Sequence, residues 1–188
     1  KLKEAPEYVL NVIFGDGTIY NSYPDYLCFS TAVNTACYLR LPSAKDKAED
    51  VIRLFKPILE DQNKVLISND VKDDIIWLRR AGVEILNKIF DVKIAHYVLQ
   101  PDSSHELERV ALEMLNYRLI KGDNTENPQL SLFPDEGAKK DKDFAERMDI
   151  LFRLKEKLEE ALQEVGLYKL YEEIEMPLVS VLADMEYE

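Results

Sequence analysis

The chain has 188 residues, enough for one domain with a full hydrophobic core but too few for a large multidomain enzyme. Its 24 Lys and Arg against 36 Asp and Glu give a formal net charge of −12. Proteins that hold nucleic acid by their own electrostatics carry the opposite sign. No apolar run approaches about 18 residues and the sequence shows no charged-then-apolar leader, so we expect neither a membrane span nor a signal peptide, and no membrane partner. The two cysteines, Cys28 and Cys37, suit a reducing cytoplasm, where we expect the protein to reside.

The first part of the chain favours strands. Residues 8–14 are rich in β-branched and aromatic types, and residues 15–17 predict a turn. Two more strands are predicted at residues 27–30 and 36–41, and the short apolar run at residues 64–68 is typical of a buried strand. A sheet therefore forms early in the sequence.

From Ala44 the apolar residues recur at helical spacing, and Pro57 must break or kink the helix that they predict. Asp70 is a candidate N-cap for a helix over residues 71–81, with Asp73 and Asp74 in its first turn. Gly82 ends that helix, and the pattern after it is again helical.

The second half predicts helices separated by one long loop. Ser103 and Glu106 form the pattern of a capping box for the helix that follows them. Residues 121–141 combine Gly, Asn and Pro with many charges, which predicts an exposed, mobile loop. Two further helices are expected over residues 142–164 and from Tyr168 onward, the second reset at Pro177. Strands followed by helices indicate an α/β (α+β) fold, a mixed sheet flanked by helices.

One segment near the end resembles a known family. Residues 174–179 read Ile-Glu-Met-Pro-Leu-Val, similar to the segment that joins the 3′–5′ exonuclease domain to the thumb of family A DNA polymerases, the bacterial DNA polymerase I type. Further matches follow the family's order at residues 55–61, 69–74 and 90–99, and His105 is similar to the His of its next helix. The resemblance implies an RNase H-like exonuclease fold.

The same resemblance implies how the chain is divided. Residues 1–170 would form the exonuclease-like domain, and residues 171–188 would begin the connection into the thumb. Because the chain starts at Lys1 and stops at Glu188 inside a helical pattern, we expect it to be cut from a longer polymerase. Its partners would be the remaining domains of that polymerase, and DNA through the full-length enzyme.

Proofreading in this family uses two metal ions held by four carboxylates, so the family's motifs decide whether the activity survives. The first motif, Asp-x-Glu-Thr, is missing from the first forty residues, where Asp16 between two glycines is the nearest carboxylate. In the second motif Asp74 keeps the ligand position and Asp70 replaces the usual Asn. Both acids equally fit a helix N-terminus without any catalysis.

The third motif, Tyr-x-x-x-Asp, aligns with residues 143–147 and departs from the family at both defining positions. Asp143 stands at the Tyr position and Arg147 at the ligand position, although Asp149 matches the following run. A guanidinium is always cationic and cannot bind Mg²⁺. We therefore expect a vestigial exonuclease site with no cofactor, in which Asp74, Asp149 and Asp70 are remnants.

The alternative is an active two-metal 3′–5′ exonuclease that uses Mg²⁺ or Mn²⁺ in a rearranged site. The acids available to it would be Asp16, Asp70, Asp74 and Asp149. In either case the chain would be part of a DNA-directed DNA polymerase that serves replication and repair.

A second motif points to a different class of function. A short motif is formed by Gln129, Leu130, Ser131, Leu132 and Phe133. It resembles the peptide with which bacterial replication proteins bind the sliding clamp. An extended peptide could place Leu132 and Phe133 in an apolar pocket of the clamp. The other interpretation is local packing, because related domains carry a similar stretch here and five-residue matches arise by chance.

Two remaining candidates have simpler interpretations. His96 and His105 have no third ligand at metal spacing, so we expect surface or capping residues of helices. Trp77 at helical spacing indicates a core residue rather than a platform for stacking bases.

Overall fold

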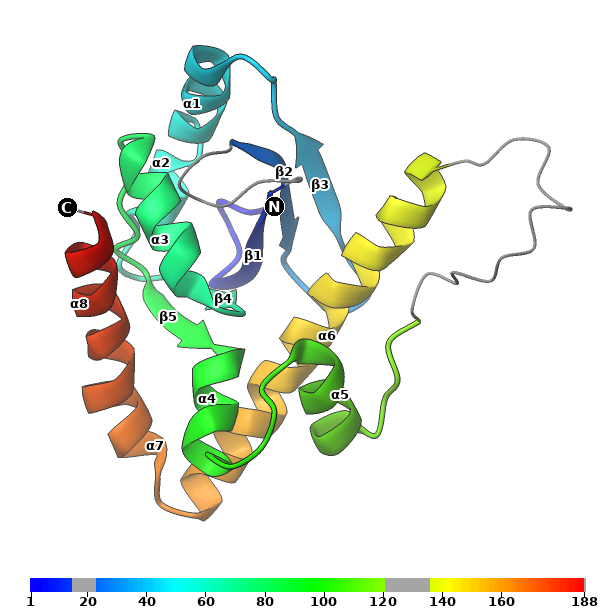
Figure 1. Ribbon diagram of the computed structural model, residues 1–188, viewed down its shortest axis with the longest axis vertical. Coiled ribbons are helices and arrows are strands. Elements are labelled where there is room, and N and C mark those ends of the chain that lie inside the picture. Colours follow the sequence, from blue (N-terminus) through cyan, green and yellow to red (C-terminus); the bar gives the residue numbers. More distant parts are fainter. Residues whose placement is uncertain (15–22, 121–135, 188) are drawn as a thin grey trace, which may run out of the picture.

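A mixed five-stranded sheet organises the fold, with strand order β3-β2-β1-β4-β5 and helices on both sides (Figure 1). The structure is a computed structural model that describes residues 1–14, 23–120 and 136–187, with only the backbone described for residues 136–141. The strands are β1 (Glu7–Phe14), β2 (Pro24–Ser30), β3 (Cys37–Arg40), β4 (Val65–Ser68) and β5 (Lys88–Asp91).

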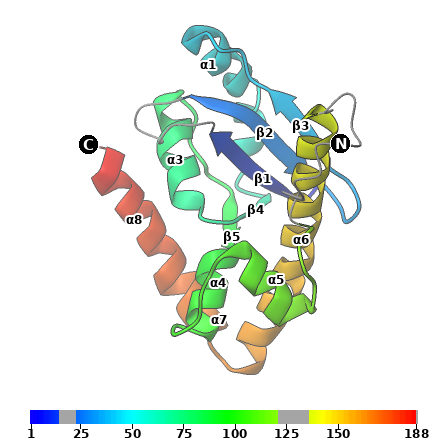
Figure 2. The same cartoon turned by 45° about the vertical axis from the view of Figure 1, so that its right-hand side comes forward.

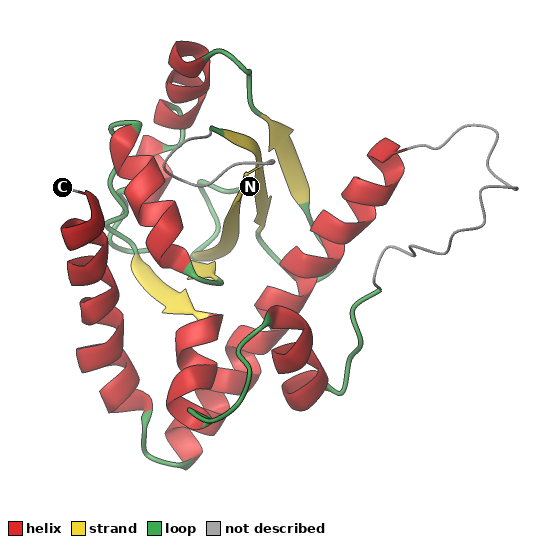
Figure 3. Ribbon diagram, viewed as in Figure 1, coloured by secondary structure: helices red, strands yellow, loops and turns green. Residues whose placement is uncertain are grey.

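The helices come mostly after the strands, as Figure 3 shows by colour. Those of the first half are α1 (Lys45–Arg53), α2 (Lys56–Leu59), α3 (Val71–Arg80), α4 (Val92–Leu99) and α5 (Leu107–Leu115). The second half has α6 (Glu136–Glu164), α7 (Tyr168–Leu170), a π-helix η1 (Tyr171–Glu175) and α8 (Met176–Tyr187). None of the helices in the described part combines the length and apolar content needed to cross a bilayer.

The sheet joins an antiparallel half to a parallel half at β1. β1 pairs antiparallel with β2, which pairs antiparallel with β3, whereas β4 runs parallel to β1 and β5 parallel to β4. The register places Val9 between Ser30 and Ile67. Because β1, β4 and β5 point the same way, their carboxyl ends lie along one edge of the sheet. The helices α3 and α4 start at this edge, directly after β4 and β5.

Helices cover both faces of the sheet, so its central strands are buried on both sides. In Figure 2 the sheet lies between α3 and α6. Ile76 and Trp77 of α3 are buried, and α6 buries a row that includes Leu151, Leu154 and Leu158 at helical spacing. Val9, Leu66 and Ile67 have no exposed surface, as expected for strands covered twice. This is the RNase H-like α/β arrangement predicted from the sequence, and Trp77 is the core residue expected.

The predictions for local structure were wrong at two helix starts. Asp70 precedes α3 in the left-handed conformation, with φ 67° and no capping bond from its side chain. Glu106 precedes α5 without a capping bond, and Ser103 instead donates to Gln100 Oε1 at 3.4 Å. Asp70 instead pairs with Lys93 of α4, whereas Ser103 has a local partner three residues before it.

Two element boundaries also differ from the sequence prediction. β5 was not predicted, because its four residues include exposed Lys88 and are too few to show an alternating pattern. α6 begins at Glu136 rather than 142, inside the segment that composition assigned to a loop. The last two residues of β5, Phe90 and Asp91, lead directly into α4, so the sequence pattern assigned them to the helical segment.

The segment α7–η1–α8 closes the open edge of the sheet beside β5. Tyr171, at the start of η1, is buried against Phe90, with ring centroids 5.3 Å apart. Its hydroxyl accepts the backbone N–H of Asp91 at 2.8 Å and donates to the Asp91 carbonyl at 3.3 Å. A tyrosine side chain thus satisfies the backbone groups at the end of β5 that a further strand would otherwise bind.

We predict that Tyr171→Phe destabilises the chain by about 1–3 kcal/mol, because it removes both hydrogen bonds between the Tyr171 hydroxyl and the buried backbone of Asp91 while preserving the ring. Tyr187→Phe is the matched control, since Tyr187 is 41% exposed and should change stability by less than about 0.5 kcal/mol. Urea unfolding measures both. Equal midpoints for the two variants would contradict this role for Tyr171.

Candidate functional site

Asp74 lies where three elements meet at the carboxyl edge of the sheet. It is in the first turn of α3, and only 4% of its surface is exposed. Its Oδ2 accepts a hydrogen bond from Ser68 Oγ, the last residue of β4, at 3.2 Å. The backbone N–H of Val12 in β1 also donates to its carboxylate. Of the predicted acids that lie in the described part of the chain, Asp74 is the one placed beside β1, through its bond with Val12.

Asp91 is a second buried carboxylate at this edge, and its two oxygens bind the N-terminal starts of two helices. Its Oδ2 accepts the backbone N–H of Val71, the first residue of α3, at 2.7 Å. Its Oδ1 accepts the N–H of Ile94 at 3.0 Å and so caps α4. The cap that the sequence assigned to Asp70 is thus supplied by Asp91, from a different strand.

Burial dominates the electrostatics of both carboxylates. Loss of water raises the pKa of Asp91 to about 6, although the N–H groups of Ile94 and Val71 act in the opposite direction. Desolvation likewise raises the pKa of Asp74 well above its usual range, with the Ser68 bond opposing and the charge of Asp91 adding to the rise. Both groups therefore bear a cost for being ionised in the folded chain.

The other predicted acids lie in different surroundings. Asp70 is half exposed and its Oδ2 pairs with Lys93 Nζ at 2.6 Å. Asp149 in α6 accepts the backbone N–H of Asn34 at 2.6 Å and pairs with Arg153 Nε at 2.7 Å. Asn34 has a left-handed backbone with φ 59°, so this contact holds a tight connection between β2 and β3 against α6. The partners of Asp149 thus differ entirely from those of Asp74.

Arg147, at the position where the family resemblance implies a metal ligand, is bound to another helix. Its guanidinium pairs with Glu108 of α5 at 3.0 Å, and both side chains are about two-fifths exposed. Next to it on α6, Glu146 accepts hydrogen bonds from Tyr117 Oη and the Ile120 backbone N–H. This stretch of α6 therefore contacts α5 and the residues that follow it.

Two predicted features lie outside the described residues. Asp16 belongs to residues 15–22, and the candidate clamp peptide of Gln129, Leu130, Leu132 and Phe133 belongs to residues 121–135. Their predictions stay predictions.

The described side chains do not fit a pair of divalent ions. Such a site needs several carboxylates directed into a shared space. Across residues 1–14, 23–120 and 136–187, no three His, Cys, Asp or Glu side chains come close enough to hold one metal ion. Val12 of β1, whose backbone N–H bonds Asp74, has an apolar side chain. What the described arrangement does is tie β1, β4, β5, α3 and α4 together.

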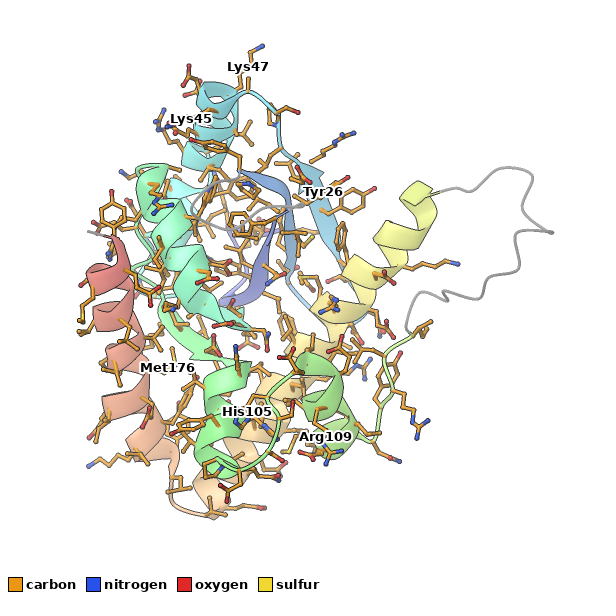
Figure 4. The ribbon with its side chains drawn as sticks, in the orientation of Figure 1. Tyr26, Lys45, Lys47, His105, Arg109 and Met176 are labelled. Carbon is orange, nitrogen blue, oxygen red and sulfur yellow. The ribbon has the colours of Figure 1, made fainter. Side chains whose placement is uncertain are left out.

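Sequence reasoning also missed a buried histidine cluster. We expected surface or capping residues, but His96 has no exposed surface, and its Nδ1 lies 2.9 Å from Nδ1 of His105. His105 and Arg109 are labelled in Figure 4. Its Nε2 lies 3.1 Å from Glu113 Oε2, and Arg109 pairs with the same carboxylate. Burial lowers the pKa of His96, although Glu113 opposes that change. The cluster fastens α5 to α4, and the only sequence signal for it was His96 on the apolar face of α4.

Comparison with known proteins identifies relatives of this chain. The sequence profile of the 3′–5′ exonuclease family matches residues 16–163. DNA polymerase I of Pseudomonas aeruginosa is 30% identical over 156 residues, which cover 79% of this chain and 17% of that protein. The chain therefore spans about a sixth of the length of this curated relative.

Solved structures share the fold at low sequence identity. The Brucella melitensis protein NrnC superposes with a TM-score of 0.78 at 18% identity, over 99% of this chain and 87% of that chain. A structure described as the POL domain of Pol1 from M. smegmatis, in complex with DNA primer-template and dNTP, has a TM-score of 0.72 at 17% identity, over 98% of this chain and 29% of that one. These likenesses show the fold alone.

We predict that Asp74→Asn makes the chain more stable at pH 8, by about 1 kcal/mol or more, because it removes a buried charge while Asn can still bond Val12 and Ser68. The sign follows from the raised pKa of Asp74. The folded state binds the proton of the Asp74 carboxyl more tightly than the unfolded state does. Protonation of Asp74 therefore stabilises the fold fully below about pH 4, and this stabilisation is lost as pH rises. The gain should therefore shrink toward zero at pH 4.

Urea unfolding of the wild type and the variant between pH 4 and pH 8 measures this difference. Asp149→Asn is the control, because it breaks the pair with Arg153 and should lower stability slightly at pH 8. A wild type that is more stable than Asp74→Asn at pH 8 would contradict the assignment.

Proposed function

The chain belongs to the 3′–5′ exonuclease family of the DNA polymerase I type, and from this premise we propose that it is the exonuclease-like domain of a DNA-directed DNA polymerase of replication and repair. In this proposal its own editing site is vestigial and the domain acts as a structural scaffold. The two free cysteines suit the cytoplasmic setting that such a role requires.

One observation carries the proposal of a vestigial site, namely the set of groups around Asp74. A proofreading site needs acceptor oxygens that are free to bind metal. Asp74 instead accepts hydrogen bonds from Ser68 and Val12. Arg147 adds a cation, paired to Glu108, at a position where the family has a ligand.

The scaffold role is supported by how firmly the last segment binds the domain. Lys72 of α3 pairs with Glu186 of α8 at 2.7 Å, and Arg79 pairs with Asp184. Tyr171 adds its bonds to the backbone of Asp91. A movement of α8 would therefore be transmitted to α3 and β5, which suits a domain that braces its neighbours.

The charge of the chain supports the same proposal. With a net charge of −12, the domain would repel a DNA backbone rather than hold one. Other domains of the polymerase would then supply the contacts to DNA, consistent with a chain that spans 17% of a curated relative.

The alternative, an active exonuclease, would need Mg²⁺ or Mn²⁺ and carboxylates that come together. Asp74 and Asp149 would have to leave their present partners, and Asp70 would have to release Lys93. No cofactor is part of the proposal, which assigns these three acids to structural roles.

We predict that the chain does not degrade labelled single-stranded DNA with Mg²⁺ or Mn²⁺, at concentrations where an active 3′–5′ exonuclease digests it completely. Loss of the four-carboxylate site should lower the rate by several orders of magnitude. Gel electrophoresis of the products measures it. Cleavage that disappears in Asp74→Asn but persists in Asp149→Asn would sink the vestigial assignment, because it would show a catalytic Asp74.

A separate alternative concerns Gln129, Leu130, Leu132 and Phe133, whose sequence pattern matches a clamp-docking peptide but also fits local packing. Calorimetry with a purified clamp separates docking from local packing. Heat of binding that is abolished by Leu132→Ala with Phe133→Ala would support docking, and its absence would leave local packing.

A further inference from the structure

The histidine cluster joins α5 to α4 through four side chains. They are His96 of α4, His105 of the connecting loop, and Arg109 and Glu113 of α5. Both histidines of the sequence belong to it. His96 has no exposed surface, so each of its ring nitrogens depends on a partner within the chain. A buried imidazole with titratable partners is a candidate for a site that responds to pH.

The contacts within the cluster determine which ring nitrogens carry protons at neutral pH. A carboxylate accepts hydrogen bonds and cannot donate them, so the 3.1 Å contact with Glu113 Oε2 requires a proton on His96 Nε2. A neutral imidazole has one N–H, so His96 Nδ1 is an acceptor. Nδ1 of His105, 2.9 Å away, must then donate. The neutral cluster thus has an arrangement in which every contact is a hydrogen bond.

The histidine cluster can accept one added proton but not two. With one added proton, a single N–H still lies between the two Nδ1 atoms, and Glu113 provides the opposite charge. With two, both Nδ1 atoms carry N–H groups that point at each other across 2.9 Å, and neither nitrogen can accept. The two imidazolium cations would also repel each other. Protonation of both rings therefore breaks the contact between His96 and His105.

The titration of His96 is governed mainly by the cluster itself. Burial lowers its pKa, and the charges of His105 and Arg109 lower it further, whereas Glu113 acts in the opposite direction. The elements packed around α4 carry further titratable groups, and these have partners of their own. They are Lys155 with Glu159 on α6, Tyr171 of η1 with Asp91 of β5, Asp70 with Lys93 of α4, and Tyr97 of α4, which contacts the His105 ring.

The position of α5 also affects α6. Glu108 of α5 pairs with Arg147 of α6 at 3.0 Å. Tyr117 and Ile120, which follow α5, both donate hydrogen bonds to Glu146 of α6. A change in the histidine cluster would therefore reach the stretch of α6 where the family resemblance implies a metal ligand.

We propose that the histidine cluster is a pH-sensitive switch, which holds α5 against α4 and α6 at neutral pH and releases it when both imidazoles are protonated. The released form can bind a proton on each histidine near the ordinary pKa of about 6.5, whereas the closed form can bind one. The closed form is therefore fully favoured above about pH 7, and release increases as pH falls below about 6. One excluded proton corresponds to a change of about tenfold per pH unit.

Hydrogen exchange of the α5 amides, residues 108–115, tests the switch. After correction for the pH dependence of intrinsic exchange, their protection should fall about tenfold between about pH 6 and pH 5. The protection of residues 65–68 in β4 should not follow this fall, because β4 is outside the released part. His105→Asn should remove most of the fall, since the Asn amide can still donate to His96 Nδ1 but cannot be protonated.

Glu113→Gln and Glu108→Gln form a matched pair of variants on the same helix. Glu113→Gln removes the charge that favours the first added proton, so release of α5 should begin at a higher pH. Glu108→Gln should leave the pH of release unchanged, because Glu108 pairs with Arg147 and does not contact either histidine. Equal shifts in the two variants would contradict the role of Glu113.

Ring ¹⁵N NMR of the wild type gives a test that does not depend on a variant, because the chain has two histidines. It should show protons on His96 Nε2 and His105 Nδ1 at neutral pH, and loss of α5 protection with the second protonation. Two fully protonated rings in a chain whose α5 amides stay protected would overturn the proposal. The same pH profile in the wild type and His105→Asn would overturn it too, since the response would then come from other groups.

Discussion

The carboxylate of Asp91 is the interaction on which the rest of this structure depends. It accepts the first N–H of α3 and caps α4, while the backbone of the same residue bonds the hydroxyl of Tyr171. One residue at the end of an edge strand therefore fixes two helices and the segment that closes the sheet. Because it has no exposed surface, each of these bonds forms without competition from water.

Asp74 depends on this arrangement, because α3 is positioned by the bond that Asp91 makes at its start. The fold of the family therefore does not depend on the metal-binding chemistry of the family. The backbone geometry that brings α3 to the ends of β1 and β4 is maintained by Asp91 and by apolar packing, neither of which needs a metal ion. The buried carboxylates of Asp74 and Asp91 are both hydrogen-bonded, so the fold at this edge is satisfied by the protein's own groups.

Much of the fold was predictable from the sequence, and the reasons differ by element. The strands β1 and β4 and the helix α3 have strong apolar patterns, so their positions were predicted within one or two residues. The exonuclease family followed from the match at residues 174–179 and was confirmed by the family profile. The cap of α3 was missed because its partner is distant in sequence, with Val71 and Asp91 20 residues apart. The same is true of His96, whose partners His105 and Glu113 come from other elements. β5 was missed because its four residues are too few to show an alternating pattern.

The π-helix at Tyr171–Glu175 sets a limit on how this segment can evolve. Its wider turn inserts about one extra residue, which shifts the phase of α8 by about 100° relative to α7. That phase lets Tyr171 point inward at β5 while Val179 and Ala183 also point inward at α3. Replacing one side chain here alters one set of contacts, as at Tyr171, whereas a deletion of a single residue would rotate every later position together. The length of the segment is therefore under stronger constraint than its composition.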